Sequence, residues 1–210
     1  MNSDPYRGRP PTSHERRSGE PWDESYRGGP APWDTGRPQP AVVRLAAEGA
    51  FAGTVLDAGC GSGENALHIA ALRLPVLGVD VAETALEQAR AKAAERGIKA
   101  EFAEVDALHL ERLGRPFATV LDCGLFHSFD EEERPMYVAS LASVCEPGTT
   151  VYVLCFSDDR PNQGPHPVSQ DDLRAAFDKG WTVVDIQPDW VQTRMSDDGV
   201  PAWLATFRRT

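Results

Sequence analysis

The chain has 210 residues, of which 21 are lysine or arginine and 32 are aspartate or glutamate, giving a formal net charge of -11 at pH 7. This length can bury one full hydrophobic core. The acidic balance argues against a nucleic-acid partner, because phosphate binding needs a basic surface. No apolar run approaches the roughly 18 residues of a membrane span, and no signal-peptide pattern is present. We therefore expect a cytoplasmic protein without a nucleic-acid or membrane partner.

The first forty residues differ in composition from the rest of the chain. They hold eight of the seventeen prolines, and almost no aliphatic residue precedes Ala41. Such a composition cannot bury enough apolar surface to order itself, so it predicts a disordered tail over residues 1–28. A solvated extension is favoured here over an arm that binds a partner. We expect a single folded domain over residues 29–210, in which residues 29–50 form a lid and the first helix.

The most specific motif lies between residues 54 and 65. An apolar run suits a buried strand, and Gly59, Gly61 and Gly63 allow a tight turn with close backbone approach. Helical composition follows from Glu64, so turn amides and a positive helix end face the same ligand. The spacing departs from the dinucleotide pattern G-x-G-x-x-G. In addition, Asp57 would repel a diphosphate but suits the ammonium group of an amino-acid zwitterion.

A second acid follows the next predicted strand, residues 76–80. Asp80 ends this strand, where a carboxylate can accept hydrogen bonds from ribose hydroxyls. A methionine zwitterion joined to adenosine therefore matches both acids. The competing interpretations are a nicotinamide-binding domain and a glycine turn without a ligand. Against the first, no tyrosine-lysine pair suited to hydride transfer is present.

Strands and helices continue to alternate along the chain. The predicted strands cover residues 54–57, 76–80, 100–104, 117–122, 149–156, 181–187 and 202–208, and the predicted helices cover residues 40–49, 64–73, 83–96 and 171–177, with another beginning near residue 134. In an alternating parallel sheet, the loop after residue 122 emerges beside the glycine turn. Residues 123–129 are therefore the natural wall of an active site.

The motif from Asp57 to Gly63, together with Asp80, resembles that of class I S-adenosylmethionine-dependent methyltransferases. The resemblance runs from about Pro32 to the C-terminus. It implies an α/β, Rossmann-like fold with a seven-stranded, mostly parallel sheet, helices on both faces and an antiparallel last strand. It implies S-adenosyl-L-methionine as the cofactor and S-adenosyl-L-homocysteine as the product. The cofactor contacts that it implies are Trp33, Asp57, Gly59, Cys60, Gly61, Gly63, Asp80, Val81, Asp106, Ala107, Asp122, Cys123 and Gly124.

A narrower resemblance concerns the residues from Pro32 to Pro40. A tryptophan, an acid and a glycine at this position are similar to the N-terminal signature of thiopurine methyltransferases, plant halide and thiol methyltransferases, and small bacterial enzymes that act on hydroxyquinolones and related heterocycles. The resemblance implies that this segment folds over the cofactor and that Trp33 packs near its sulfonium, which an aromatic face attracts. The alternative is that Trp33 only fills the edge of the core.

These features predict methyl transfer by in-line displacement to an O, N or S nucleophile of a small heteroaromatic or xenobiotic-like acceptor. His127 is the candidate general base, since an ordinary histidine pKa near ~6.5 allows it to accept a proton; the alternative is a structural hydrogen-bond donor. The predicted acceptor contacts are Tyr26, Phe126, His127, Phe129 and Trp190. The four cysteines show no metal-binding or disulfide spacing, so no metal is expected.

Two alternative functions remain open at this point. A halide or thiol methyltransferase would differ by a small closed pocket that needs no base. A non-catalytic module would bind the cofactor and use the acidic surface for a protein partner. The sequence leaves the oligomeric state open.

Overall fold

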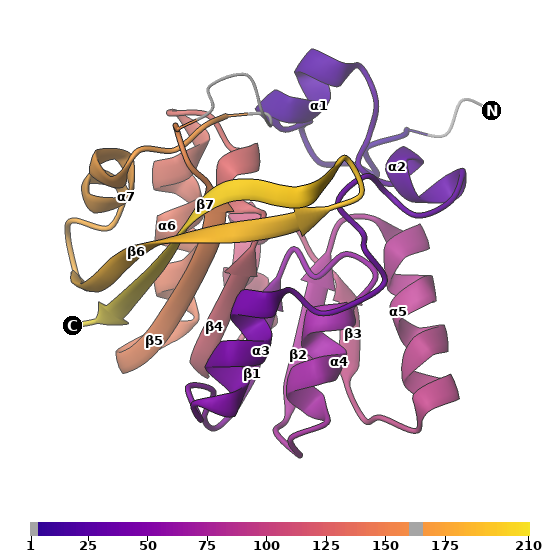
Figure 1. Cartoon of the computed structure of the whole chain (residues 1–210). Coiled ribbons are helices and arrows are strands. Elements are labelled where there is room, and N and C mark those ends of the chain that lie inside the picture. The colour runs from indigo at the N-terminus through magenta and orange to yellow at the C-terminus, as the bar shows by residue number, and fades with distance from the viewer. Residues whose placement is uncertain (1–3, 160–165) are drawn as a thin grey trace.

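The computed structural model describes residues 4–159 and 166–210, and its centre is a seven-stranded sheet of order β3-β2-β1-β4-β5-β7-β6 (Figure 1). The strands are β1 (Val55–Ala58), β2 (Val76–Asp80), β3 (Glu101–Glu104), β4 (Phe117–Cys123), β5 (Cys145–Phe156), β6 (Trp181–Thr193) and β7 (Ser196–Arg209). The first five strands pair in parallel, whereas β7 runs antiparallel to both β5 and β6. The predicted mostly parallel sheet with an antiparallel last strand is confirmed.

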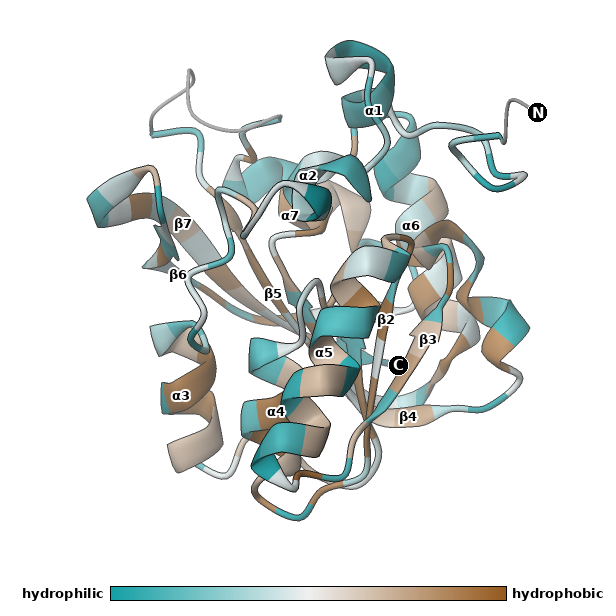
Figure 2. Ribbon diagram, turned by 90° about the vertical axis from the view of Figure 1, so that its right-hand side faces the viewer, coloured by the Kyte–Doolittle hydropathy of each residue, from teal (hydrophilic) through white to brown (hydrophobic). Residues whose placement is uncertain are grey.

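Helices cover both faces of this sheet. They are α3 (Pro40–Ala47), α4 (Glu64–Ala70) and α5 (Glu83–Arg96) on one side and α6 (Glu133–Ser143) and α7 (Gln170–Ala176) on the other (Figure 1). Alternate strand residues point to opposite faces, so Val55 packs with α3 and α4 while Leu56 packs with α6 and α7. Figure 2 shows the strands coloured mainly apolar between helices that carry hydrophilic residues on their outer sides. The fold therefore has three layers.

Strands β6 and β7 extend further than the sequence predicts. Pairing of β5 with β7 ends at Phe156 and Ala202, but β6 and β7 continue to pair with each other as far as Thr193 and Ser196. Irregularities in the β6-β7 pairing, between Val183 and Asp185 and between Val191 and Thr193, interrupt the period of two by which a strand is predicted. The tip of this β6-β7 ribbon contacts the segment before α3, where Arg194 N–H donates to the Pro32 carbonyl at 2.8 Å.

The N-terminal segment differs most from the expectation of disorder. Residues 1–3 lie outside the described residues, but residues 4–28 contain α1 (Ser13–Ser18) and α2 (Glu24–Arg27), above the carboxyl edge of the sheet (Figure 1). Ser13 donates to Glu133 at the start of α6 through both its N–H and its Oγ, each at 2.6 Å. Asp23 accepts from Thr84 N–H on α5 at 2.7 Å. Polar contacts with distant elements order this segment, which composition does not reveal.

Among the described residues, no helix has both the length and the apolar character to cross a membrane.

Candidate active site

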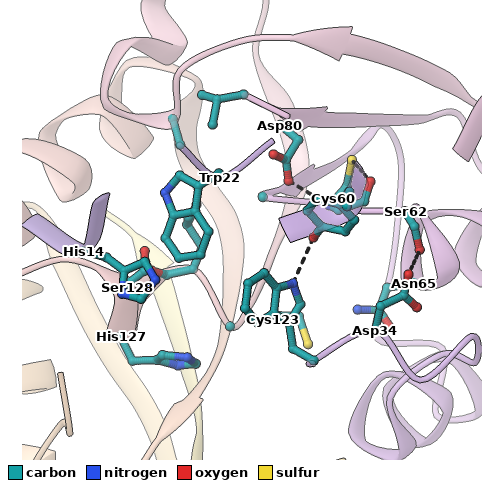
Figure 3. Close-up of a pocket in the computed structure, with 18 of the residues that line it drawn as sticks. His14, Trp22, Asp34, Cys60, Ser62, Asn65, Asp80, Cys123, His127 and Ser128 are labelled. Atoms are coloured by element: carbon teal, nitrogen blue, oxygen red, sulfur yellow. Dashed lines mark hydrogen bonds between the residues drawn. The ribbon is translucent and has the colours of Figure 1, made fainter. Parts of the chain in front are cut away.

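A cavity of about 490 Å³ lies at the carboxyl edge of β1, β2 and β4, beneath the N-terminal segment (Figure 3). This volume is in the usual range of small-molecule sites. Thirteen of the predicted site residues line it: Tyr26, Trp33, Gly59, Cys60, Gly61, Asp80, Val81, Asp106, Ala107, Cys123, Gly124, His127 and Phe129. The predicted residues Asp57, Gly63, Asp122, Phe126 and Trp190 are not among the residues that line it.

The glycine turn forms one wall of the cavity. Gly59, Gly61 and Gly63 have φ values of +71°, +51° and +83°, which side-chain-bearing residues rarely adopt. A Cβ on Gly61 would lie 2.7 Å from the Tyr26 hydroxyl oxygen, so the turn also has no room for one. The turn therefore brings bare backbone to the cavity, as close binding of a ligand requires.

Asp80 fixes the turn and also faces the cavity. Its Oδ2 accepts from Gly61 N–H at 2.8 Å, and its Oδ1 accepts from Ala82 N–H at 2.9 Å. Each carboxylate oxygen keeps a second acceptor site for a ligand hydroxyl. Burial raises the pKa of Asp80, although these backbone hydrogen bonds and Arg9 oppose the shift. Hydrogen-bond donors on a bound ligand would stabilise the ionised form of the Asp80 carboxyl group.

Two further acids are buried behind the turn. Asp57 on β1 and Asp122 on β4 are at most 1 % exposed, and neither oxygen of Asp57 has a hydrogen-bond partner within the part of the chain that the structure describes. Asp122 Oδ1 accepts from the N–H groups of Leu125 and Phe126 at 2.9 and 3.2 Å, and thereby shapes the loop after β4. Burial raises the pKa of each carboxyl group to about 7. The structure thus places Asp57 beneath the cavity wall and Asp122 as a support of the loop.

The buried carboxyl of Asp57 predicts a particular pH dependence of stability. Its folded-state pKa of about 7 lies above its ordinary value of 3.8. The unfolded chain therefore loses this proton first, so the free energy of unfolding should fall as the pH rises from about 4 to about 7. At 1.36 kcal/mol per pKa unit, Asp57→Asn should be about 2 to 4 kcal/mol more stable than the parent at pH 8, but similar at pH 3.5.

Urea unfolding of the cofactor-free protein at several pH values measures this difference. Asp197→Asn, on the exposed tip of the β6-β7 ribbon, is the matched control and should follow the parent. Parallel stability curves for Asp57→Asn and the parent would show that Asp57 is not responsible.

His127 is held as a hydrogen-bond donor. It lies on the short helix η2 (Phe126–Ser128), and its Nδ1 accepts from Phe156 N–H at 3.1 Å while the two rings stack 4.0 Å apart. The neutral ring therefore carries its proton on Nε2. Burial lowers the pKa of His127 to about 3, with positive charge on Arg134 as a further cause. This arrangement favours the alternative interpretation, a donor, over the predicted general base.

The rings of three predicted acceptor contacts point elsewhere. The Phe129 ring is buried and packs on Tyr137, although the residue borders the cavity. Phe126 is fully buried and packs on Tyr137 and Phe177 in the core. Trp190 is 47 % exposed on β6, so it supplies no wall to the cavity. By contrast, Tyr26 is buried over the turn, where its hydroxyl accepts from Trp33 Nε1 at 2.9 Å. The aromatic side of the site is built largely from the N-terminal segment.

Sequence reasoning missed several cavity residues in that segment and around it. They are Arg9, Thr12, His14, Arg17, Trp22, Asp34, Ser62, Asn65 and Met195, with others from the same elements. The available signal was a repeat, because Pro21-Trp22-Asp23 has the same three residues as Pro32-Trp33-Asp34. The two tryptophans meet edge to face at 5.6 Å. Both copies of this Pro-Trp-Asp sequence, the one with Trp22 and the one with Trp33, therefore belong to the site.

Across residues 4–159 and 166–210, no three or more His, Cys, Asp or Glu side chains are grouped to hold a metal ion.

The strand order, the glycine turn after β1 and the acid after β2 together define a Rossmann-like fold of the methyltransferase type. Residues 55–148 match a family model described as a methyltransferase domain. The chain is 38% identical over 178 residues to 2-heptyl-1-hydroxyquinolin-4(1H)-one methyltransferase from Mycobacteroides abscessus, which covers 80% of this chain and 78% of that protein. The chain belongs to the S-adenosylmethionine-dependent methyltransferases, as predicted.

Two further comparisons agree with this assignment. A probable thiol methyltransferase 2 from Arabidopsis thaliana is 28% identical over 147 residues, covering 69% of this chain and 65% of that one. A solved structure from work on the conversion of a disulfide bond into a thioacetal group during echinomycin biosynthesis matches with a TM-score of 0.82 and 38% identity. It covers 90% of this chain and 91% of its own.

Proposed function

We propose that this enzyme transfers a methyl group to an O, N or S nucleophile of a small heteroaromatic acceptor in the cytoplasm. The observation that carries the proposal is the division of the cavity into two halves (Figure 3). One half consists of the glycine turn with Asp80, and the other carries the indole and imidazole rings of Trp22, His14 and His127. A flat, neutral ring system suits such a wall.

The first half fits S-adenosylmethionine. The turn from Gly59 to Gly61 offers backbone to the amino-acid end, and Asp80 offers acceptor sites to the ribose. Asp106 and Ala107 line the same cavity at the start of η1 (Ala107–Leu113), where we place the adenine. Bound there, the cofactor supplies an electrophilic methyl group on a sulfonium.

The protein's own contribution is alignment and exclusion of water. Trp33 packs edge to face against both Trp22 and Tyr26, at 5.6 and 6.1 Å, so three aromatic rings close the cavity beside the turn. Aromatic faces attract a cation such as a sulfonium and keep water away from it. In-line displacement then needs only that the acceptor be held in line with the methyl group.

The acceptor class is supported by the relative from Mycobacteroides abscessus, whose name specifies a hydroxyquinolone. The Arabidopsis relative, named as a thiol methyltransferase, supports a sulfur nucleophile as the alternative. The deciding experiment measures S-adenosylhomocysteine release with iodide, hydrosulfide, an aryl thiol, a catechol, a heterocyclic amine and 2-heptyl-1-hydroxyquinolin-4(1H)-one. We expect turnover confined to the ring compounds, with the hydroxyquinolone among the best.

Turnover with iodide or hydrosulfide alone would contradict the proposal and place this protein with the halide and thiol enzymes. Cofactor binding without any turnover would favour the non-catalytic module. Omission of S-adenosylmethionine is the control for each acceptor.

A further inference from the structure

A second histidine faces the acceptor half of the cavity. His14 belongs to α1 and lines the same cavity as His127. Figure 3 shows His14, Trp22, His127 and Ser128 together on one side, with Cys60 and Ser62 on the other. The two histidines therefore come from distant parts of the sequence to one end of the site, the end away from the glycine turn.

The His14 ring is held in place although no side chain of residues 4–159 or 166–210 hydrogen-bonds to it. It stacks on Trp22 with ring centroids 4.3 Å apart and an interplanar angle of 20°. Its chain neighbour Ser13 donates through Oγ to Glu133 at 2.6 Å and to the Ser128 carbonyl at 3.4 Å, which ties α1 to the loop that carries His127. His14 Nδ1 is enclosed and has no hydrogen-bond partner among the described residues. Because Nδ1 is enclosed, the oriented ring can meet a ligand in the cavity only through its other nitrogen, Nε2, to which no described residue hydrogen-bonds.

The charges around His14 keep it neutral but able to accept a proton. Burial and the adjacent Arg17 lower the pKa of His14, whereas Glu15 opposes that shift. From the facing elements come His127, which is neutral, and His166, which contacts Ser13 Oγ at 3.2 Å. Arg9 also lines the cavity, but Glu15 binds it through two hydrogen bonds. His127 differs because its Nδ1 is already occupied by a backbone N–H.

We propose that His14 is the general base of the reaction and that His127 binds the acceptor through Nε2–H. This inference rests on the proposed function and narrows its substrate class. The acceptor is a neutral, weakly acidic heteroaromatic compound whose nucleophile is a hydroxyl, N-hydroxyl or N–H group. A second hydrogen-bond acceptor on the same ring system, such as a carbonyl oxygen, receives the His127 N–H.

The charges and atoms balance in this step. The proton of the nucleophile passes to the His14 imidazole, and the freed electron pair forms the new bond to the methyl carbon. The carbon-sulfur bond breaks, and its electron pair stays on sulfur as a neutral thioether. The positive charge that began on the sulfonium is then on the His14 imidazolium, which releases its proton to solvent.

The test compares two acceptors that differ in their need for a base. One is 2-heptyl-1-hydroxyquinolin-4(1H)-one, and the other is an aryl thiolate that is already ionised at the assay pH. His14→Gln should reduce kcat for the hydroxyquinolone by roughly 10²- to 10⁴-fold, the usual contribution of a general base, but by less than tenfold for the thiolate. Cofactor affinity should stay within threefold of the parent. Glu20→Gln, an exposed substitution shortly after α1, is the control for the segment.

Two further readouts separate a catalytic from a structural role. In the parent, kcat/KM for the hydroxyquinolone should fall as the pH drops through the His14 pKa, which burial lowers from its ordinary value, and it should not do so for the thiolate. Without cofactor, the ring resonance of His14, assigned by its loss in His14→Gln, should shift when the hydroxyquinolone is added. Equal losses with both acceptors, weakened cofactor binding or an unmoved resonance would overturn the proposal.

Failure of the proposed function looks different, because the parent would then methylate no acceptor in the panel. The resonance of His14 would still decide whether this residue contacts a heteroaromatic ligand.

Discussion

Replacing Asp80 by alanine is expected to weaken S-adenosylmethionine binding by at least tenfold. The substitution removes the acceptor that holds Gly61 N–H at 2.8 Å and Ala82 N–H at 2.9 Å, together with the sites left for the ribose. Hydrogen bonds to a charged group contribute about 1.5 to 3 kcal/mol each, and every 1.4 kcal/mol is a factor of ten in affinity. Calorimetry with S-adenosylmethionine and S-adenosylhomocysteine measures the loss directly.

Two variants separate the ribose contact from damage to the turn. Asp80→Asn keeps one acceptor oxygen but no charge, so we expect an affinity between those of the parent and the alanine variant. Glu101→Ala removes an exposed carboxylate from the neighbouring strand β3 and should leave binding unchanged. Unchanged affinity in Asp80→Ala, with the protein folded, would rule out the ribose assignment.

The half of the cavity that we propose for the cofactor could be located from the sequence because its determinants are local. Gly59, Gly61 and Gly63 follow a buried strand directly, and their positive φ values are what such a spacing of glycines implies. Asp80 ends the next strand, and parallel pairing of β1 with β2 necessarily brings it to the same edge. Strand, turn and register together fix this half of the site without help from the rest of the chain.

The acceptor half was not predictable in the same way. Its His14 and Trp22 rings come from residues 4–28, where prolines and charges suggest disorder and where order depends on contacts such as Ser13 with Glu133. Glu15 is fully buried, although glutamate is rarely found inside a protein. Its burial is possible because Arg9 and the N–H groups of Thr12 and Trp22 donate hydrogen bonds to its carboxylate. Contacts between positions more than a hundred residues apart leave no periodic pattern in a sequence.

Side-chain direction was the other source of error. The segment from Leu125 to Phe129 was correctly placed beside the glycine turn, but the 3₁₀ turn directs the rings of both Phe126 and Phe129 into the core, where each contacts Tyr137. For Trp190, the alternation of side chains along β6 decides its direction, because its neighbour Val191 points into the core. A motif locates such residues on the right loop or strand, and only the packing around them decides which way they point.

Gly63→Ala is expected to destabilise the protein by about 2 to 5 kcal/mol. Gly63 has a φ of +83°, a conformation that costs an alanine about 1 to 2 kcal/mol. Its Cβ would also lie 2.7 Å from the Ala89 Cβ and 3.0 Å from the Phe102 ring, and such overpacking adds about 1 to 3 kcal/mol. Because Gly63 N–H closes the turn on the Cys60 carbonyl, cofactor affinity should fall as well.

Gly97→Ala isolates the contribution of the backbone. Gly97 has a φ of +63° at the end of α5, but no atom lies within 4 Å of the position that its Cβ would take. Urea unfolding should therefore show that this variant loses only about 1 to 2 kcal/mol of its free energy of unfolding. The slope of that free energy against urea concentration should be unchanged in both glycine variants. Equal losses for Gly63→Ala and Gly97→Ala would mean that α5 and β3 move aside at no cost. The close packing of helix, strand and turn would then not be what fixes the cofactor turn.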